Sequence, residues 1–428
     1  MQSSISVLKN LPNDVRLERL EALVYASETL NKAQDLDGIL FSILDLVQVQ
    51  LDCERATVFL LDQRTGKLHA RQMIGSERIE IILERSVGIA GSVFDTSESV
   101  LINDVQSDKR FNREIDVRTG FLTKTMLCVP LRKVGGETIG VLQAINTRSN
   151  VFSETCLIYL ESFASVAAVA VEREQLVQNA MRMKLLSTEL ELARKIQQRL
   201  LPSSGKIKLQ EPFSAFGLSQ SCYDVGGDAY DAIVLPSGEC VFWVADVSGK
   251  GIGAALLMNS LQTELRALVH AERDLSKLAK ALNERINEVA PIGTYATLFL
   301  GIINAKENRL SYLNAGHVSP VWLNPQTNET RDFKPGGLPI GLFPSGEYDV
   351  FDTAFGGGER IAIFSDGVTD AVNTNDEIFE DNGLKESFDK TISKDVEGIG
   401  KEFFEILDRY RMGASATDDT TFLVVGLS

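Results

Sequence analysis

Apolar positions fall into two long regions of the chain, and their spacing changes from segment to segment. In the first region, residues 35–171, "LDGILFSILDLVQVQL" has helical spacing, whereas "ATVFLLD" has the pattern of a strand. Two apolar runs, "TMLCVPLRK" and "TIGVLQAIN", flank Gly135-Gly136 and predict an antiparallel hairpin. The helical stretch "ETCLIYLESFASVAAVAVERE" closes the region. This order predicts an α+β sensor domain with helices on one face of a sheet.

The second region, residues 211–428, is dominated by short apolar runs of strand length. Helical spacing occurs between them at residues 254–270, 275–289 and 400–410. Because most of these runs follow one another as in β-hairpins, they predict mainly antiparallel sheets. With the helices packed outside the sheets, this is again an α+β arrangement. The expected strands are "AIVL", "CVFWVADV", "ATLFLGIIN", "LSYLNAG", "VWLN", "RIAIFSDG" and "TFLVVGLS".

Residues 172–202 lie between the two regions and contain no glycine or proline before Pro202. Apolar residues recur there at heptad spacing, which predicts a short parallel coiled coil that pairs two chains. The alternative is a single long helix packed on its own domain. A further helix is expected within residues 1–34 and would extend the same dimer. The expected a positions are Leu176, Met183, Leu190 and Gln197, and the d positions are Asn179, Leu186, Ala193 and Leu200, with Asn179 and Gln197 setting the register.

The charge balance narrows the classes of partner. The 428 residues carry 59 acidic and 43 basic side chains, a net charge of −16. Nucleic acids and anionic membranes bind basic surfaces, so we expect neither as a partner. Histidine occurs only at His69, His270 and His317, which disfavours an imidazole zinc site and leaves carboxylates and hard cations for any metal centre.

The remaining composition indicates the compartment. The five cysteines, at positions 53, 128, 156, 222 and 240, have no CxxC spacing and are typical of reduced core residues. No apolar run approaches the roughly 18 residues of a membrane span, and the amino end lacks the apolar region of a signal peptide. We therefore expect a soluble, cytoplasmic protein.

Aspartates stand at the ends of apolar strands throughout the second region. An acid in such a place is costly unless its charge is offset, and several acids at one sheet edge repel one another. Two divalent cations held about 3.5–4 Å apart would relieve this repulsion and create a centre for phosphoester hydrolysis. The acids concerned are Asp228 and Asp231 in "DVGGDAYD", Asp246 after "VFWVA", Asp366 after "IAIFS", and Asp418 and Asp419 before "TTFLVV".

The glycine-rich turn after Asp246 has a rival interpretation as a phosphate-binding loop. A Walker A loop needs Ser or Thr after its lysine, but Gly251 follows Lys250, and position 244 is Val rather than Gly. The dinucleotide fingerprint GxGxxG also fails, because "GKGIGA" reads GxGxG. The glycines fit better as residues that permit close backbone approach and leave a carbonyl free beside a metal.

Eight motifs in this region occur together in the order found in one family. They resemble the metal-dependent PPM serine/threonine phosphatases, in particular the SpoIIE/RsbU type. The resemblance covers about 200 residues and implies an α-β-β-α sandwich with two antiparallel sheets. The motifs are "ELARKIQQRLLP", "GGDAYD", "DVSGKGIGAALLM", "YATLFLGI", "LSYLNAGHVSP", "LPIGL", "FSDGVTDA" and "DDTTFLVV".

The resemblance also implies roles for single residues. Asp228 resembles a ligand of the first metal, and Asp246 resembles the carboxylate that bridges both metals, beside the carbonyl of Val247. Asp366 and Asp418 resemble the remaining ligands. The metals implied are two Mn²⁺ or Mg²⁺ ions, which activate a water to attack a phosphoserine or phosphothreonine without a covalent intermediate.

Each of three further residues has two possible roles. Asp419 stands where many relatives outside this type carry Asn, and would ligate a metal directly or through water. Lys250 either attracts the phosphate or is a solvated loop lysine. His317, in "NAGH", either orients a water or a loop or is structural. No phosphate-clamping arginine stands near the motifs.

The first region resembles a GAF domain over about 140 residues. "INDVQSDKRFNREIDVRTGFLTKTMLCVPL" looks like the cyclic-nucleotide-binding subgroup. The subgroup's NK…F…DE signature is only partly present, as Asn146, Thr147, Phe152 and Cys156-Leu157. A small-molecule effector site and an unliganded pocket that serves dimerisation remain equal alternatives, and the ligand is unknown.

Together these observations predict a signal-regulated, metal-dependent protein serine/threonine phosphatase that is dimeric. The resemblance implies a phosphorylated STAS-type anti-anti-sigma protein as its partner. Two other functions stay open: a non-catalytic GAF-based scaffold, and a two-metal hydrolase of small phosphoesters. The expected organisation is an N-terminal helix in residues 1–34, a GAF domain in 35–171, a coiled-coil linker in 172–202 and a phosphatase domain in 211–428.

Overall fold

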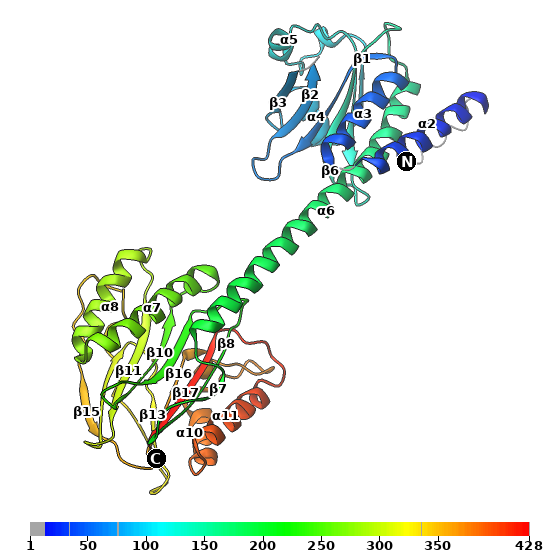
Figure 1. Cartoon of the computed structure of the whole chain (residues 1–428). Coiled ribbons are helices and arrows are strands. Elements are labelled where there is room, and N and C mark those ends of the chain that lie inside the picture. The colour runs from blue at the N-terminus through cyan, green and yellow to red at the C-terminus, as the bar shows by residue number, and fades with distance from the viewer. Residues whose placement is uncertain (1–12, 34, 75–76, 335, 428) are drawn as a thin grey trace. The chain divides into compact units, whose positions relative to one another are not determined.

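The computed structural model describes residues 13–33, 35–74, 77–334 and 336–427. The chain divides into two compact units, Met1–Lys184 and Leu185–Ser428 (Figure 1). Residues 1–12 and 34 of the range expected for the N-terminal helix, residues 1–34, lie outside the described residues. Within that range, helix α2 covers Asn13–Lys32.

The first unit contains one antiparallel sheet of six strands in the order β3-β2-β1-β6-β5-β4. The predicted hairpin is confirmed as β5–β6, and Gly136 in its turn has a φ of 89°, a conformation that glycine adopts without strain. The strands are β1 (Cys53–Leu61), β2 (Leu68–Ile74), β3 (Glu77–Leu83), β4 (Val100–Ile102), β5 (Met126–Arg132) and β6 (Thr138–Thr147).

Helices cover both faces of this sheet, so the expectation of helices on one face is wrong. Helices α2, α3 and α6 share one apolar core with β1, β5 and β6. Helix α4 packs on the opposite face, in a second core with β2 and β3. Its sequence "GIAGSVFDT" is too short to show a clear helical period. The helices are α3 (Leu36–Gln50), α4 (Gly88–Thr96), α5 (Arg113–Thr119) and α6 (Glu154–Leu200), with a 3-10 turn at Val105–Ser107.

Helix α6 is 47 residues long and contains a window of 18 residues that is long and apolar enough to cross a membrane. The expectation that no apolar run approaches a membrane span is therefore wrong. The apolar character of this window is also explained by packing, because 44% of the window is buried inside the protein. Leu160, Phe163, Ala167 and Val171 pack in the core of the first unit. Length and composition alone thus do not make α6 a membrane span.

The second unit is a sandwich of two antiparallel sheets between two pairs of helices, which confirms the α-β-β-α expectation (Figure 1). One sheet has the order β15-β12-β11-β10-β9, and the other β14-β13-β16-β17-β8-β7. An aromatic-rich core fills the space between them. The strands are β7 (Gly205–Ile207), β8 (Phe213–Gln220), β9 (Asp228–Val234), β10 (Cys240–Val247), β11 (Ala296–Asn304), β12 (Arg309–Ala315), β13 (Val321–Asn324), β14 (Glu329–Asp332), β15 (Phe351–Ala354), β16 (Arg360–Phe364) and β17 (Thr420–Leu427).

Two helices pack on the outer face of each sheet. Helices α7 (Ile252–Ala271) and α8 (Leu275–Val289) share a core with β9, β10 and β11. On the other side, α10 (Glu380–Thr391) and α11 (Val396–Arg411) cover β16, β17 and β8. The helical periods expected at 254–270, 275–289 and 400–410 are confirmed, and α10 was not expected. A short helix, α9 (Asp366–Thr369), follows β16.

The last turns of α6 belong to the second unit, which corrects the expected coiled-coil seam. Gln197 is only 4% exposed, and its side chain forms two hydrogen bonds with the backbone of Gly226, at 2.7 and 3.1 Å. The carbonyl of Leu200 accepts a hydrogen bond from Gln262 on α7. Gln197 is therefore not available as a polar residue of a seam between two chains, because its amide already binds the loop before β9.

Candidate active site

Two neighbouring strands place Asp228 and Asp246 side by side. Asp228 begins β9 and Asp246 is the last residue but one of β10, and the two are direct partners in the antiparallel ladder. Side chains of directly paired residues lie on the same face of a sheet. Asp228 is 3% exposed, and its Oδ2 accepts a 2.7 Å hydrogen bond from the hydroxyl of Ser365. Its Oδ1 is buried without a hydrogen-bond partner among the described residues.

The carboxylates of this site raise one another's pKa values. Burial raises the pKa of Asp228 well above its usual range, and the charge of Asp246 adds to the increase. Burial, followed by the charge of Asp366, raises the pKa of Asp246 to about 7. Burial and then the charge of Asp418 raise the pKa of Asp366. Keeping several carboxylates close together in this buried site therefore costs electrostatic free energy. Such an arrangement is expected of a site that binds positive charge.

Asp366 and Asp418 come from the opposite sheet, on loops that touch each other. Asp366 begins α9 directly after β16, and Asp418 lies just before β17. The loops meet at Gly367, where a Cβ atom would overlap the carbonyl oxygen of Asp419. A glycine is therefore required at position 367 for this approach. The strand ends of both sheets converge here, as the sequence predicts.

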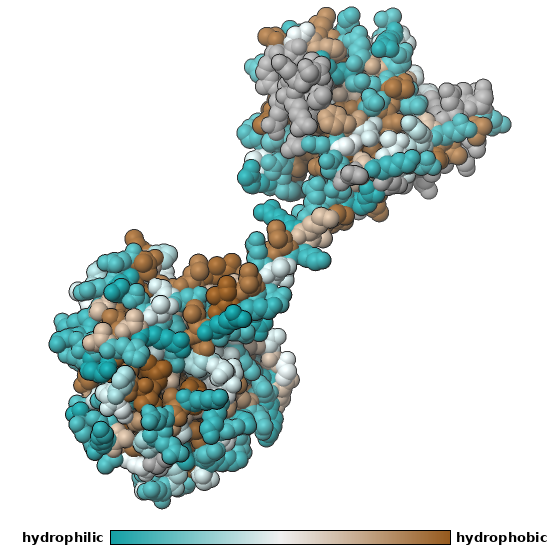
Figure 2. All heavy atoms as spheres, in the orientation of Figure 1, coloured by the Kyte–Doolittle hydropathy of each residue, from teal (hydrophilic) through white to brown (hydrophobic). Residues whose placement is uncertain are grey.

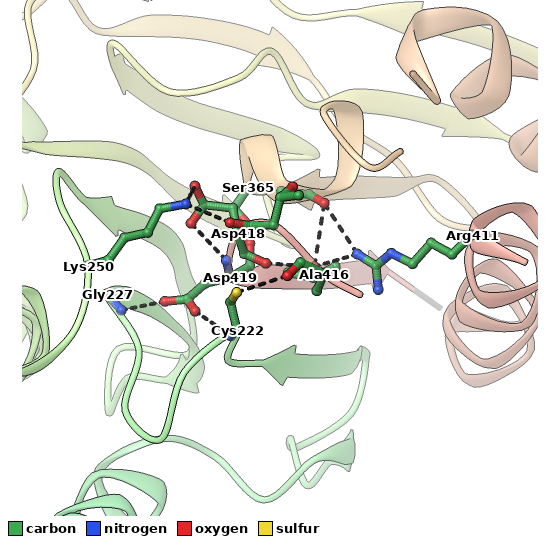
Figure 3. A network of polar contacts seen from close by, with 11 residues as sticks. Cys222, Gly227, Lys250, Ser365, Arg411, Ala416, Asp418 and Asp419 are labelled. Atoms are coloured by element: carbon green, nitrogen blue, oxygen red, sulfur yellow. Dashed lines mark hydrogen bonds and ion pairs between the residues drawn. The ribbon is translucent and has the colours of Figure 1, made fainter. Parts of the chain in front are cut away.

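Asp419 anchors the surrounding loops. Its Oδ1 accepts a 2.8 Å hydrogen bond from the backbone N–H of Cys222, and its Oδ2 accepts one of 2.6 Å from Gly227 (Figure 3). The hydroxyl of Ser365 donates to the carbonyl oxygen of Asp419 at 3.2 Å. Both carboxylate oxygens are thus already engaged by the backbone. The carbonyl oxygen of Val247 lies across the same loop, 2.9 Å from the position of a Cβ on Gly227.

Lys250 reaches the site from the loop between β10 and α7 (Figure 3). Its Nζ lies 2.8 Å from Oδ2 of Asp418 and donates a 2.6 Å hydrogen bond to the carbonyl of Thr417. Lys250 is therefore not a solvated lysine without contacts, although its side chain is 44% exposed.

His317 is buried behind Asp246. Its Nδ1 shares a 2.7 Å hydrogen bond with the hydroxyl of Thr297, which pairs with Asp246 across β10 and β11. Burial lowers the pKa of His317 to about 4, so the imidazole is neutral at pH 7. Its backbone N–H donates to Asn314 at 2.8 Å, which fixes the turn after β12. These contacts favour a positioning role for His317 over that of a cationic group.

Asp231 does not join the other acids. It lies three residues after Asp228 in β9, so its side chain is on the opposite face of the sheet. There its Oδ2 accepts hydrogen bonds from Arg266 at 2.6 Å and Gln262 at 3.0 Å, both on α7. Asp231 thus holds α7 on the sheet.

Arg411 is a residue of this region that sequence reasoning missed. It ends α11, is 7% exposed, and donates hydrogen bonds to the hydroxyl of Thr420 at 2.8 Å and the carbonyl of Gly367 at 3.4 Å (Figure 3). It therefore ties together the loops that carry Asp366 and Asp418. The six residues between Arg411 and Asp418 lack an apolar pattern that would reveal this contact.

The donor set fits a hard cation in its chemistry. Divalent cations such as Mn²⁺ and Mg²⁺ prefer carboxylate and carbonyl oxygens, which are the groups gathered here. The unpartnered Oδ1 of Asp228 is an acceptor without a donor, and the raised pKa values indicate unbalanced negative charge. In the described parts of the chain, no three His, Cys, Asp or Glu side chains are already arranged around one point as a metal cage.

Comparison with known families assigns both units. Residues 35–171 match the GAF domain, and residues 236–428 match the family described as Stage II sporulation protein E (SpoIIE). The second unit also has the fold of the SiaA-PP2C domain of Pseudomonas aeruginosa, with a TM-score of 0.51 and 19% identity over 58% of this chain and 99% of that one. The chain thus combines a GAF domain with a domain of the PP2C fold.

Individual relatives agree with this division. A probable 3′,5′-cyclic phosphodiesterase of Caenorhabditis elegans, pde-5, is 32% identical over 33% of this chain, which spans 21% of that protein. Phosphoserine phosphatase RsbU of Bacillus subtilis is 26% identical over 56% of this chain, which spans 70% of RsbU. Protein IcfG of Synechocystis is 27% identical over 55% of the chain, which spans 41% of IcfG. The protein therefore contains a GAF domain and a SpoIIE-type phosphatase domain of the PPM class.

Proposed function

We propose that the protein is a metal-dependent protein serine/threonine phosphatase. The observation that carries this proposal is the buried pair Asp228–Asp246, whose negative charge is not balanced and whose Asp228 Oδ1 has no partner in the described structure. The pair lies where strands of both sheets end, and Asp366 and Asp418 come to the same place from the second sheet. The match to the SpoIIE family and the similarity to phosphoserine phosphatase RsbU support the same activity.

Asp228, Asp246, Asp366, Asp418 and the carbonyl of Val247 would hold two Mn²⁺ or Mg²⁺ ions. When bound, such ions lower the pKa of water and neutralise charge on phosphoryl oxygens. Ser365 orients Asp228 through its hydroxyl, and Thr297 with His317 supports the strand opposite Asp246. Asp419 would contact a cation, directly or through water, only with lone pairs not used by Cys222 and Gly227.

We expect phosphoserine or phosphothreonine in a protein to be hydrolysed, and a phosphorylated STAS-type protein to be the substrate. The test compares the purified protein on phosphoserine proteins, phosphopeptides and small phosphoesters, each with Mn²⁺, Mg²⁺ or excess EDTA. Turnover of phosphoproteins with either ion, lost in EDTA, is the expected result.

Other outcomes separate the alternatives. Turnover of small phosphoesters alone would favour a general phosphoesterase. Activity that survives complete chelation would contradict the metal-dependent mechanism, and no turnover of any substrate would favour a non-catalytic scaffold. We place this activity in the cytoplasm, where phosphorylated regulatory proteins occur.

The GAF domain contains a cavity that suits a small effector. The cavity has a volume of about 60 Å³, room for a few water molecules as it stands. Arg55 stacks on Phe121 at 4.0 Å, and Asp116 accepts hydrogen bonds from the backbone and hydroxyl of Thr123 at its rim. Asn146, part of the incomplete signature, is used structurally, because its amide bonds Glu54, Leu122, Lys124 and Thr125. We propose an effector that contacts Arg55 and Phe121.

We also propose that α6 pairs two chains through its middle section. Apolar side chains are exposed there at heptad spacing, and Figure 2 shows brown residues among the teal ones along this helix. Leu176 is 63% exposed, Met183 66% and Leu186 45%. Since Gln197 is bound to the Gly226 loop, the seam would end before it.

Replacing Leu186 and Leu190 with Glu tests this pairing. Each buried apolar side chain stabilises a helix pair by about 1.5–3 kcal/mol, and glutamates in the seam would repel each other. We expect a weakened dimer by sedimentation velocity and activity that no longer depends on the GAF domain. The control places Glu at Met181 and Thr188, which are f positions of the same heptad pattern and lie on the face opposite the seam. A dimer that survives the first pair of changes would show that α6 is only a spacer.

A further inference from the structure

Lys250 forms an ion pair with Asp418, one of the carboxylates of the site. In the part of the chain that the structure describes, it is the one basic residue that forms an ion pair with Asp228, Asp246, Asp366, Asp418 or Asp419. Its Nζ is 2.8 Å from Asp418, and its charge also acts on Asp366 and opposes the increase in the pKa of that residue. Lys250 therefore supplies part of the positive charge that this end of the site requires.

The backbone of the loop around Lys250 is little restrained by neighbouring atoms at its two glycines. Gly249 and Gly251 on either side have φ values of 95° and 77°, and no atom lies within 4 Å of the Cβ position of either glycine. Glycine at such positions adopts many backbone conformations at little cost. The ammonium is held by two contacts near the site, one with Asp418 and one with the carbonyl of Thr417. Both contacts are polar, so breaking them would remove no apolar packing.

We propose that Lys250 is an internal counter-cation, which occupies the Asp366–Asp418 end of the metal-free site and is displaced when a divalent cation binds there. The inference rests on the proposed metal-dependent function and concerns its regulation. The carboxylate of Asp418 cannot bind the ammonium and a metal ion at the same time without a loss of binding energy, because the two cations repel each other at close range. Cation binding therefore breaks the Lys250–Asp418 ion pair and releases the ammonium on its glycine-flanked loop.

The exchange has a consequence for the phosphorylated substrate. The released ammonium carries the same charge as before but is no longer neutralised by Asp418. It becomes available to a phosphoryl group that approaches the site, whereas in the metal-free protein it is engaged. Metal occupancy and attraction of the substrate are thus coupled through one side chain.

Calorimetric titration of the full chain with Mn²⁺ tests the competition without an activity assay. Lys250→Met keeps the apolar stem and removes the competing charge, so we expect Mn²⁺ to bind roughly three- to tenfold more tightly. Lys250→Arg retains a cation and is expected to bind Mn²⁺ like the unchanged protein. Lys306→Met, at an exposed lysine of the same unit, is the control for loss of a positive charge and is expected to change nothing.

A second measurement follows the side chain itself. Acetylation of lysines, followed by mass spectrometry, is expected to label Lys250 faster with saturating Mn²⁺ than in EDTA, while the rate at Lys306 stays constant. Equal or weaker Mn²⁺ binding by Lys250→Met, or equal labelling in both states, would overturn the proposal even if Mn²⁺ binds to the unchanged protein. If the unchanged protein binds no Mn²⁺, the proposed function fails and this inference with it.

Discussion

Asp246→Asn is expected to lower phosphatase turnover by several orders of magnitude and to leave the fold intact. Asp246 faces Asp228 across two strands and is approached by Asp366, so its charge serves both halves of the site. Asn has nearly the same shape but carries no charge, and one oxygen replaces two. Binding of Mn²⁺ should therefore weaken strongly. Turnover on a phosphoserine protein and calorimetric binding of Mn²⁺ are the measurements.

The same substitution makes a prediction about stability without metal. Burial raises the pKa of Asp246 to about 7, above the value in the unfolded chain, so the native protein binds the extra proton. Stability from this group is present at low pH and lost as pH rises from about 4 through 7. In EDTA at pH 8, Asp246→Asn should thus melt at the same temperature as the unchanged protein or higher. Asp349→Asn, an exposed aspartate in the same unit, is the matched control. Near-normal turnover of Asp246→Asn would refute the role of this residue.

Gly367→Ala is expected to remove most activity by a different route, through the backbone. A Cβ at this position would overlap the carbonyl oxygen of Asp419 and approach Asp418, so the two loops must separate. Overpacking of this kind costs about 1–3 kcal/mol. The separation would also break the hydrogen bonds of Ser365 and Arg411 that join the loops. We expect a lower melting temperature, weak Mn²⁺ binding and turnover reduced at least a hundredfold.

Gly356→Ala provides the control for this substitution. Gly356 lies in the same unit, and no atom stands within 4 Å of its Cβ position, so an alanine fits there. Its melting temperature and turnover should match those of the unchanged protein. If Gly367→Ala retained full Mn²⁺ affinity and turnover, the close contact between the Asp366 and Asp418 loops would not matter for catalysis.

Much of the fold could be predicted because long apolar runs fix its strands. The runs ending at Asp246 and Asp366 are buried on both faces, and strands of that kind stand out in a sequence. The sequence also predicted that the aspartates after these strands lie close together, because strands of two packed sheets can end at the same edge of the sandwich. Helix α10 was missed because Gly383 and several charged residues interrupt its apolar period.

The contacts that complete the site could not be predicted from the sequence. Gln197 has a heptad position, and a heptad does not reveal whether a polar side chain faces a second chain or a loop of its own. Arg411 and Asp419 bind backbone groups, whose positions depend on the tertiary structure. Asp231 shares the motif of Asp228, but the period of two in a strand sends it to the opposite face.

The hydrogen bonds between Gln197 and Gly226 limit where the GAF domain can be replaced by another sensor domain in an engineered protein. A shortened catalytic fragment that begins at Pro202 would lack this attachment, although it would contain every aspartate of the site. A foreign sensor should therefore be joined upstream of Gln197, within the exposed part of α6. Each residue added or removed there turns the two ends of the helix by about 100° relative to each other. The number of helical residues between the junction and Gln197 therefore sets the rotation of the new sensor domain about the helix axis. This number can be varied when chimeric phosphatases are built.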